Sequence, residues 1–258
     1  MNDYALITGA SKGIGRAMAL LLAQKGYSLL LVARSANELE NLTALIKSQY
    51  NVEAAYYVAD LAVSGTASQI AGWVKTLDVP VSILINNAGF GIWGNFEQLD
   101  IAGQTSMIQV NITAVAELSH YLLPTLKAQK QAYILNVSST AAYQAVPTLA
   151  IYAASKSFVL SFSRALRYEL KSTTVSVSCL CPGPTDTGFA HSAGMDALAE
   201  LAAKFNMTAD DVARIGINGM LLKKAEIVPG FLNKLSATAA KHSPKAFIEH
   251  ITAGLYKK

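Results

Sequence analysis

The sequence is poor in charge, in cysteine and in long apolar runs. Only 15% of its 258 residues are Asp, Glu, Lys or Arg and 52% are hydrophobic, a composition that excludes an intrinsically disordered chain. It holds no run of about 18 uncharged apolar residues, the length that a membrane-spanning helix needs. A glycine-rich segment already begins at Gly9, so we expect no secretory signal peptide.

The two cysteines, Cys179 and Cys181, are too few for a disulfide framework. They alternate on one predicted strand, and none of the four histidines has metal-ligand spacing with them. We therefore predict core cysteines, no metal site and a reduced, cytoplasmic location.

The net charge of +4 is too small to indicate a nucleic-acid partner, but it is unevenly distributed. From residue 204 onward there are nine Lys or Arg and four Asp or Glu, against twelve and thirteen before it. This basic end is either a solvated face or a surface for a polyanion or an anionic membrane.

Short apolar runs alternate with helical patterns along the chain. The patterns predict strands at residues 4–7, 28–33, 52–58, 81–85, 133–137 and 175–180, a short last strand at 227–230, and helices at about 14–25, 39–46, 64–77, 103–129, 152–170, 195–204 and 208–223. Apolar strands separated by helices indicate a parallel sheet covered on both faces. We predict a single doubly wound, Rossmann-type α/β domain, in which about 188–225 form a substrate-side helical segment and about 230–258 a helical extension.

The segment Thr8–Gly15 lies between the first predicted strand and the first predicted helix. There glycines let backbone amides approach a pyrophosphate, and the helix N-terminus favours its negative charge. The residues predicted to bind a dinucleotide are Gly9, Ser11, Lys12, Gly13, Ile14 and Gly15. The spacing Gly-x-x-x-Gly-x-Gly is also compatible with a methyltransferase loop or a plain turn.

The second predicted strand is followed by Arg34, where an enzyme that uses NAD carries an acid for the ribose 2′-hydroxyl. Arg34 and Lys12 predict a site for the 2′-phosphate of NADP, because a guanidinium binds phosphate in a bidentate manner. The alternative is that both are surface charges.

Tyr152 and Lys156 lie one turn apart on a predicted helix, so their side chains share a face. An ammonium beside a phenol lowers the phenol pKa, which is ordinarily about 10, toward the range of acid–base chemistry. Ser139, at the end of a predicted strand, is the candidate for holding a carbonyl oxygen. Ser138 is the alternative and points to the opposite face of that strand.

Taken together, these residues resemble the short-chain dehydrogenase/reductase family. The resemblance covers residues 4 to about 190 and rests on an ordered set: Thr8–Gly15, Asp60-Leu61, Asn86–Gly89, Asn111, Ser139, Tyr152, Lys156 and Pro182–Thr187. It implies that Tyr152 is the acid in reduction and the base in oxidation, that Lys156 binds the nicotinamide ribose and lowers the Tyr152 pKa, and that Ser139 orients the carbonyl.

The resemblance implies further roles. Asn111 would hold a water that links Lys156 to solvent, unless it is only a polar contact in a helix. The implied cofactor contacts are Asp60, Leu61, Asn87, Ala88, Gly89, Pro182, Gly183, Thr185 and Thr187, with a helix N-cap as the alternative for Thr187. NADP(H) is the implied cofactor, and a homodimer or homotetramer the implied assembly.

Substrate contacts are expected from loops at the carboxyl ends of the strands. These loops supply Phe90, Trp93, Tyr143, Val146, Phe189 and the segment from 191 to about 223. Because the named residues are mostly apolar, they favour a hydrophobic carbonyl or alcohol over a sugar, although such aromatics are also often plain packing.

The end of the chain departs from the usual family pattern. Residues 182–189 and 227–234 are similar to a bacterial branch near ketoacyl and hydroxysteroid reductases. For residues 230–241 and 246–258 we expect one of three roles: they cap the substrate site, they pair with a neighbouring subunit, or they lie on a membrane. The leading function is an NADP-dependent carbonyl/alcohol oxidoreductase. The alternatives are a nucleotide-binding redox sensor and a membrane-surface interaction protein.

Overall fold

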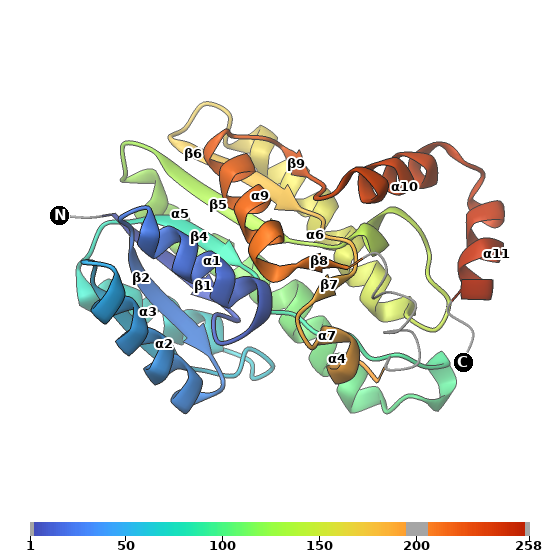
Figure 1. Cartoon of the computed structure of the whole chain (residues 1–258), viewed down its shortest axis with the longest axis horizontal. Helices are drawn as coiled ribbons and strands as arrows, with labels where there is room; N and C mark the ends of the chain where they lie inside the picture. Colours follow the sequence, from blue (N-terminus) through green and yellow to red (C-terminus); the bar gives the residue numbers. More distant parts are fainter. Residues whose placement is uncertain (1–2, 195–205, 256–258) are drawn as a thin grey trace.

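A seven-stranded, wholly parallel sheet forms the centre of the computed structural model, which describes residues 3–194 and 206–255 (Figure 1). The strand order is β3-β2-β1-β4-β5-β6-β9. The strands are β1 (Tyr4–Thr8), β2 (Ser28–Ala33), β3 (Ala54–Val58), β4 (Val81–Asn86), β5 (Ala132–Val137), β6 (Val175–Leu180) and β9 (Glu226–Ile227). From β1 the chain adds β2 and β3 on one side, and it then returns to add β4 and the later strands on the other side. The junction of β1 and β4 is therefore a topological switch point. It lies beside the glycine-rich segment, where doubly wound folds bind ligands.

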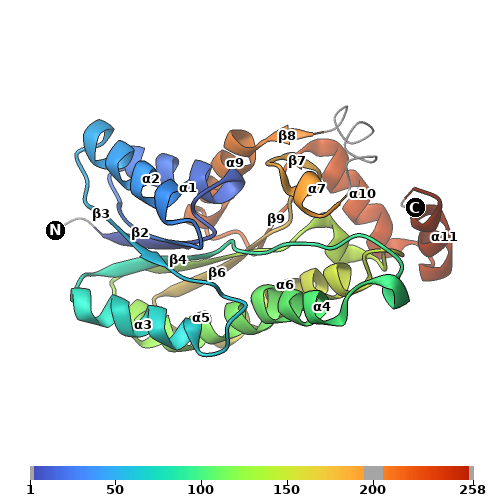
Figure 2. The ribbon, with the colours of Figure 1, turned by 90° about the horizontal axis from the view of Figure 1, so that it is seen from below.

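Helices cover both faces of this sheet (Figure 2). One face carries α1 (Gly13–Gln24), α2 (Ala36–Gln49) and α9 (Ala209–Leu221), and the other carries α3 (Thr66–Leu77), α4 (Ile101–Ile108), α5 (Ala114–Lys127) and α6 (Ala150–Glu169). The prediction of a doubly wound α/β fold is therefore confirmed. None of the helices among the described residues is long and apolar enough to span a bilayer.

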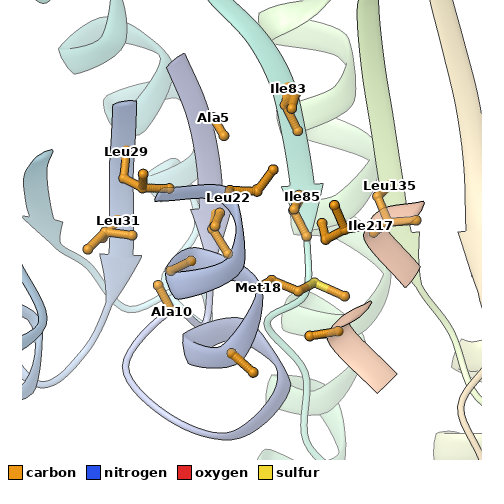
Figure 3. Packing of buried hydrophobic residues seen from close by; sticks show 14 of the residues in the cluster. Ala5, Ala10, Met18, Leu22, Leu29, Leu31, Ile83, Ile85, Leu135 and Ile217 are labelled. Carbon is orange, nitrogen blue, oxygen red and sulfur yellow. The ribbon is translucent and has the colours of Figure 1, made fainter. Parts of the chain in front are cut away.

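The uniform apolar character of the strands reflects this two-sided burial. Along β2 every residue is buried; Leu29 and Leu31 belong to the cluster around Met18 and Leu22 of α1, and Leu30 to the cluster on the other face. Figure 3 shows the first cluster at the junction of α1, the sheet and α9. Each fully buried Leu contributes about 1.5–3 kcal/mol to stability, so this packing fixes α1 and the loop that precedes it.

The one long helix predicted over residues 103–129 is divided in the structure. Between α4 and α5 lies a π-helical segment, η2 (Gln109–Thr113), whose wider turn contains Asn111. Such π segments often occur at functional sites. The predicted helix over 208–223 is confirmed as α9, with Thr208 as its N-cap accepting a hydrogen bond from the Asp211 N–H (3.1 Å).

Short elements that the sequence did not predict surround the carboxyl ends of the strands. They are the 3₁₀ turns η1 (Phe96–Gln98) and η3 (Thr140–Tyr143), the helix α7 (Phe189–Ser192), and the strands β7 (Thr185–Asp186) and β8 (Met207–Thr208), which pair with each other. The helix predicted at 195–204 lies outside the described residues. Two helices, α10 (Phe231–His242) and α11 (Lys245–Leu255), complete the described chain.

Candidate active site

The glycine loop after β1 packs closely against the loops after β4 and β6, at the start of α1. A Cβ on Gly15 would collide with the Gly9 carbonyl oxygen and the Asn87 amide, and Gly13 has a φ of +52° and lies against Thr187. The first turn of α1 has no acidic residue, and the Lys12 side chain does not cap it. These features, in a loop that also contains Ser11 and Ile14, fit a pyrophosphate held by backbone amides at a helix N-terminus.

Lys12 and Arg34 lie near the ends of neighbouring elements, as predicted. Arg34 follows β2 directly and is exposed, and it forms no ion pair with any residue of the described ranges. Lys12 instead contacts Glu38 in the first turn of α2, with 2.8 Å between Nζ and Oε1. The carboxylate of Glu38 thus lies beside one of the two predicted phosphate ligands, a feature that sequence reasoning missed.

The Asn87 side chain ties the loop after β4 to the glycine loop. Its Nδ2 donates to the carbonyl oxygens of Thr8 (3.0 Å) and Gly9 (3.1 Å), while the Thr8 hydroxyl accepts from the N–H groups of Asn87 and Ala88. The amide of Asn87 is therefore used to hold two strand-end loops together.

Lys156 is almost fully buried on α6. Its Nζ donates to the Val137 carbonyl oxygen at 3.0 Å. Burial lowers the Lys156 pKa from its ordinary 10.5 to about 8, against a smaller raising effect of the thiols of Cys179 and Cys181. At pH 7 the side chain is still mostly a cation.

Tyr152 lies next to this cation, as the spacing predicts. The Lys156 Nζ is 5.8 Å from the centre of the Tyr152 ring, and Tyr152 itself is buried. An ammonium at this distance stabilises a phenolate. The Tyr152 ring also contacts Phe189, with 5.5 Å between ring centres.

Ser138 and Ser139, the two candidates at the end of β5, have different surroundings. Ser138 is buried, and its hydroxyl donates to the Lys156 carbonyl oxygen (2.7 Å). This hydrogen bond joins the end of β5 to α6. Ser139 is half-buried, and its hydroxyl oxygen accepts from the Ala141 N–H (3.1 Å). The hydroxyl proton of Ser139 is then oriented to donate elsewhere.

Asn111 and Lys156 meet at Gly89. A Cβ on Gly89 would come within 3.1 Å of both the Asn111 Oδ1 and the Lys156 Nζ. Asn111 is fixed by the backbone of Phe90, since its Oδ1 accepts from the Phe90 N–H (3.1 Å) and its Nδ2 donates to the Phe90 oxygen (2.9 Å). Its Nδ2 also donates to Ser155, a partner that sequence reasoning missed although it lies between Tyr152 and Lys156.

The loop after β6 faces the glycine loop. Thr187 lies against Gly13, and its hydroxyl accepts from the Phe189 N–H (3.3 Å), an N-cap-like contact next to the Gly188 N-cap of α7. The Thr185 hydroxyl donates to the Gly183 carbonyl oxygen (2.9 Å). Thr187 therefore brings the loop 182–187, which also contains Pro182, Gly183 and Thr185, against the glycine loop.

Three other predicted contact residues have partners of their own. Asp60 is exposed and accepts from the Ala62 N–H, but the Leu61 side chain packs in the core. The Tyr143 hydroxyl donates to Glu226 of β9 (2.8 Å), and its ring packs with Cys179 and Cys181. Burial first, and then its neighbours Cys181 and Glu226, raise the Tyr143 pKa, so this phenol stays protonated.

The remaining predicted substrate residues form one apolar cluster with Tyr152. Phe90, Trp93, Val146 and Phe189 belong to it, together with residues that were not predicted: Ile92, Met107, Leu149 and Ile151. The Trp93 N–H donates to the Ala193 carbonyl oxygen (3.0 Å), which brings the end of α7 to this cluster. Cys179 and Cys181 are buried and free, with 3.8 Å between their sulfurs, as the core-cysteine prediction requires.

Comparison with known proteins gives a consistent set of similarities. The profile of the family described as short chain dehydrogenase matches residues 3–198. The very-long-chain 3-oxoacyl-CoA reductase-A of Danio rerio is 33% identical over 186 residues, which are 70% of this chain and 58% of that protein. The chain spans between 54 and 59% of the length of three such curated relatives.

Solved structures match over nearly the whole chain. A 7β-hydroxysteroid dehydrogenase structure has a TM-score of 0.87 at 23% identity, covering 97% of this chain and 96% of that one, which supports the fold. A short-chain dehydrogenase from Sphingobium yanoikuyae in complex with NADPH gives 0.83 at 27% identity, covering 95% and 97%. One from Burkholderia phymatum in complex with NAD gives 0.82 at 25%, covering 92% of each.

Proposed function

The chain belongs to the short-chain dehydrogenase family, and on that premise we propose that it is an NADP(H)-dependent oxidoreductase that interconverts a hydrophobic carbonyl compound and its alcohol. The observation that carries the proposal is the meeting of Lys156 and Asn111 at Gly89, with the Tyr152 ring beside the Lys156 ammonium, at the switch point of the sheet and next to the glycine loop. This set supports catalysis over a purely sensing role.

The residues that would hold the cofactor are those of the glycine loop, Arg34, residues 87–89, Lys156 and the loop 182–187. When bound, NADP(H) supplies or accepts the hydride. Every other step falls to the protein. It must position the carbonyl carbon, place a proton donor at the carbonyl oxygen and stabilise the charge that develops there.

Tyr152 donates the proton in reduction and accepts it in oxidation. The buried ammonium of Lys156, kept near the Tyr152 ring by the Val137 carbonyl, favours the phenolate and so brings the phenol toward working pH. Ser139 donates a second hydrogen bond to the substrate oxygen, with its own oxygen lone pair already engaged by the Ala141 N–H. Both donors are fixed before the substrate arrives.

The apolar cluster beside Tyr152 supports a hydrophobic substrate. Phe90, Trp93, Val146 and Phe189 would desolvate the group next to the carbonyl, while Tyr143 is held by Glu226 and packs with Cys179 and Cys181. The names of the similar proteins, a very-long-chain 3-oxoacyl-CoA reductase and a hydroxysteroid dehydrogenase, agree with this substrate class. The cytoplasmic location remains a prediction.

Two binding titrations and one variant test the proposal. NADPH and NADH are titrated into the purified chain by nicotinamide fluorescence, and a panel of hydrophobic ketones and aldehydes is then added. In the Tyr152→Phe variant we expect turnover to fall at least about a hundredfold, the usual scale of general acid catalysis, while the Kd for NADPH stays within about twofold. Tyr121→Phe, a half-exposed tyrosine of α5, is the matched control.

The outcomes separate the alternatives. Full turnover in Tyr152→Phe would contradict the mechanism. Tight NADPH binding without oxidation by any panel member would favour the redox sensor. If neither nucleotide binds, the cofactor assignment itself is wrong.

A further inference from the structure

A polar cleft lies at the amino-terminal ends of β5 and β6, whereas the candidate active site lies at the carboxyl ends of the strands. The cleft has a volume of about 220 Å³ and is lined by residues between 167 and 176, together with Gln131 and Lys223. Among the described strands, β9 pairs with β6 only at Cys179 and Leu180, which leaves the outer edge of the first residues of β6 open. Sites that enclose drug-sized molecules have roughly 300–1,000 Å³, so an occupant of this cleft is small.

Three cationic side chains line the cleft, and no carboxylate of the described residues does. The cations are Arg167 near the end of α6, Lys171 just after that helix, and Lys223 after α9. Within the described part of the chain no ion pair engages any of the three, and this includes the neighbouring Glu169. Glu226, the acid nearest to Lys223 along the chain, already pairs with two other cations. The positive charge of the cleft therefore attracts an anion from solution.

Arg167 is held in the cleft by neutral acceptors of other elements. Its Nη1 donates to the Ser176 hydroxyl (3.1 Å) and the Val177 carbonyl oxygen (2.7 Å), and its Nη2 donates to the Lys223 carbonyl oxygen (2.7 Å). A cation that served only the helix dipole would instead contact the last carbonyls of α6. A guanidinium has five N–H donors, so two remain after these three contacts. The side chain is thus oriented in advance and keeps its full charge.

The two ammonium groups are also positioned by neutral partners. The Lys223 Nζ donates to the Gln131 Oε1 (2.5 Å), and the Lys171 Nζ lies 4.1 Å from the centre of the Tyr168 ring. Lys223 has a φ of +55°, a left-handed conformation that is uncommon for a residue with a side chain. Residues held in such conformations cluster at ligand-binding and active sites. An ammonium has three donors, so each lysine retains donors for a ligand.

We propose that this cleft binds a small, multiply charged oxyanion of the phosphate class. The Arg167 guanidinium suits two phosphate oxygens at once, and Lys171 and Lys223 add charge on either side. Ser176 contributes a neutral donor, because its oxygen already accepts from Arg167 and its hydroxyl proton is left to donate. The proposal does not depend on the reaction that the protein catalyses.

Pyrophosphate is the probe, and ¹⁵N TROSY spectra of the full chain at low ionic strength show where it binds. We expect the backbone amides of residues 173–176 and 223–224 to shift with a common Kd. The amides of residues 9–15 report separately on the glycine loop in the same spectra. An equal ionic strength of sodium chloride is the control for screening.

Two variants and a matched control test the assignment of the cations. Lys171→Met and Lys223→Asn should each raise the Kd of the cleft at least about tenfold, the usual effect of losing a hydrogen bond to a charged group. Asn is chosen at position 223 because it tolerates a left-handed backbone. Lys224→Met is the matched control, since Lys224 is an exposed lysine next to Lys223 that does not line the cleft.

Circular dichroism melting establishes that each variant is folded, and either cleft variant alone is sufficient for the test. Amides at 173–176 that do not shift in millimolar pyrophosphate overturn the proposal. So do shifts that sodium chloride reproduces, or a Kd that changes equally in Lys171→Met, Lys223→Asn and Lys224→Met. Shifts confined to residues 9–15 also overturn it, and they would leave the proposed cofactor site intact.

Discussion

Lys156 carries a charge at a position that disfavours charge. Its side chain is 5% exposed, and its pKa falls from 10.5 to about 8 chiefly because burial penalises the ammonium. The Val137 carbonyl and the nearby Tyr152 ring compensate only in part. An apolar residue would be more stable at this position, so we infer that the charge is retained for the proposed chemistry.

This conflict predicts a pH-dependent stability. Between about pH 8 and 10.5 the unfolded lysine keeps its proton while the folded one releases it, so the stability of the folded chain rises with pH. Compared with Lys156→Met, which never carries the charge, the wild type should gain roughly 1.4 kcal/mol for each pKa unit of the shift. Urea unfolding of both chains at pH 7, 8, 9 and 10 measures the difference between their free energies of unfolding. A difference that stays the same at every pH would contradict the prediction. The Met variant should also lose turnover.

At the scale of elements, Thr208 links a helix start to the active-site loop. Its hydroxyl accepts from the Asp211 N–H as the cap of α9, and its backbone in β8 pairs with Asp186 of β7, next to Thr185. We expect Thr208→Ala to lower the free energy of unfolding by about 1 kcal/mol. Thr208→Ser, which keeps the hydroxyl, should stay near wild type in the same urea titration. Equal losses in both variants would mean that the methyl group, not the cap, is what matters.

Elements with a local signal were predictable, and those made by distant contacts were not. The apolar run of β2 and the capping box at Thr208 each depend on a few adjacent residues. The π turn around Asn111 depends on its bonds to Phe90, 21 residues away, and β7 exists only because Met207 reaches Thr185. The hydrophobic periodicity of a segment carries no information about contacts with distant residues. The pattern over residues 103–129 therefore predicted one continuous helix.

The same division holds for the candidate site. Tyr152, Lys156 and the glycine loop could be named from spacing, because one turn of helix or one strand-to-helix junction determines their geometry. The contact of Tyr143 with Glu226 depends on where β9 joins the sheet, 83 residues later in the chain. The sequence therefore suggested Tyr143 for the substrate, although its hydroxyl is held at the sheet edge.

For the whole molecule, we expect binding of the proposed cofactor and folding stability to be coupled. The glycine loop, α1 and the loop 182–187 meet only in the folded chain, so a ligand that binds there stabilises the fold by about 2.7 kcal/mol at a hundred times its Kd. Because Arg34 is exposed and free of carboxylate partners within the described ranges, its guanidinium is available to a 2′-phosphate. NADPH should therefore raise the melting temperature more than NADH at equal concentration.

Arg34→Asp should reverse that order, because a carboxylate repels the 2′-phosphate and accepts hydrogen bonds from the 2′-hydroxyl of NADH. Arg16→Asp is a charge-matched control on an exposed position of α1. Thermal unfolding of the three chains with each nucleotide measures the shifts without any substrate. If Arg34→Asp still prefers NADPH, Lys12 must leave Glu38 and bind the 2′-phosphate alone. In that case Glu38→Gln should strengthen NADPH binding, because it frees the Lys12 ammonium.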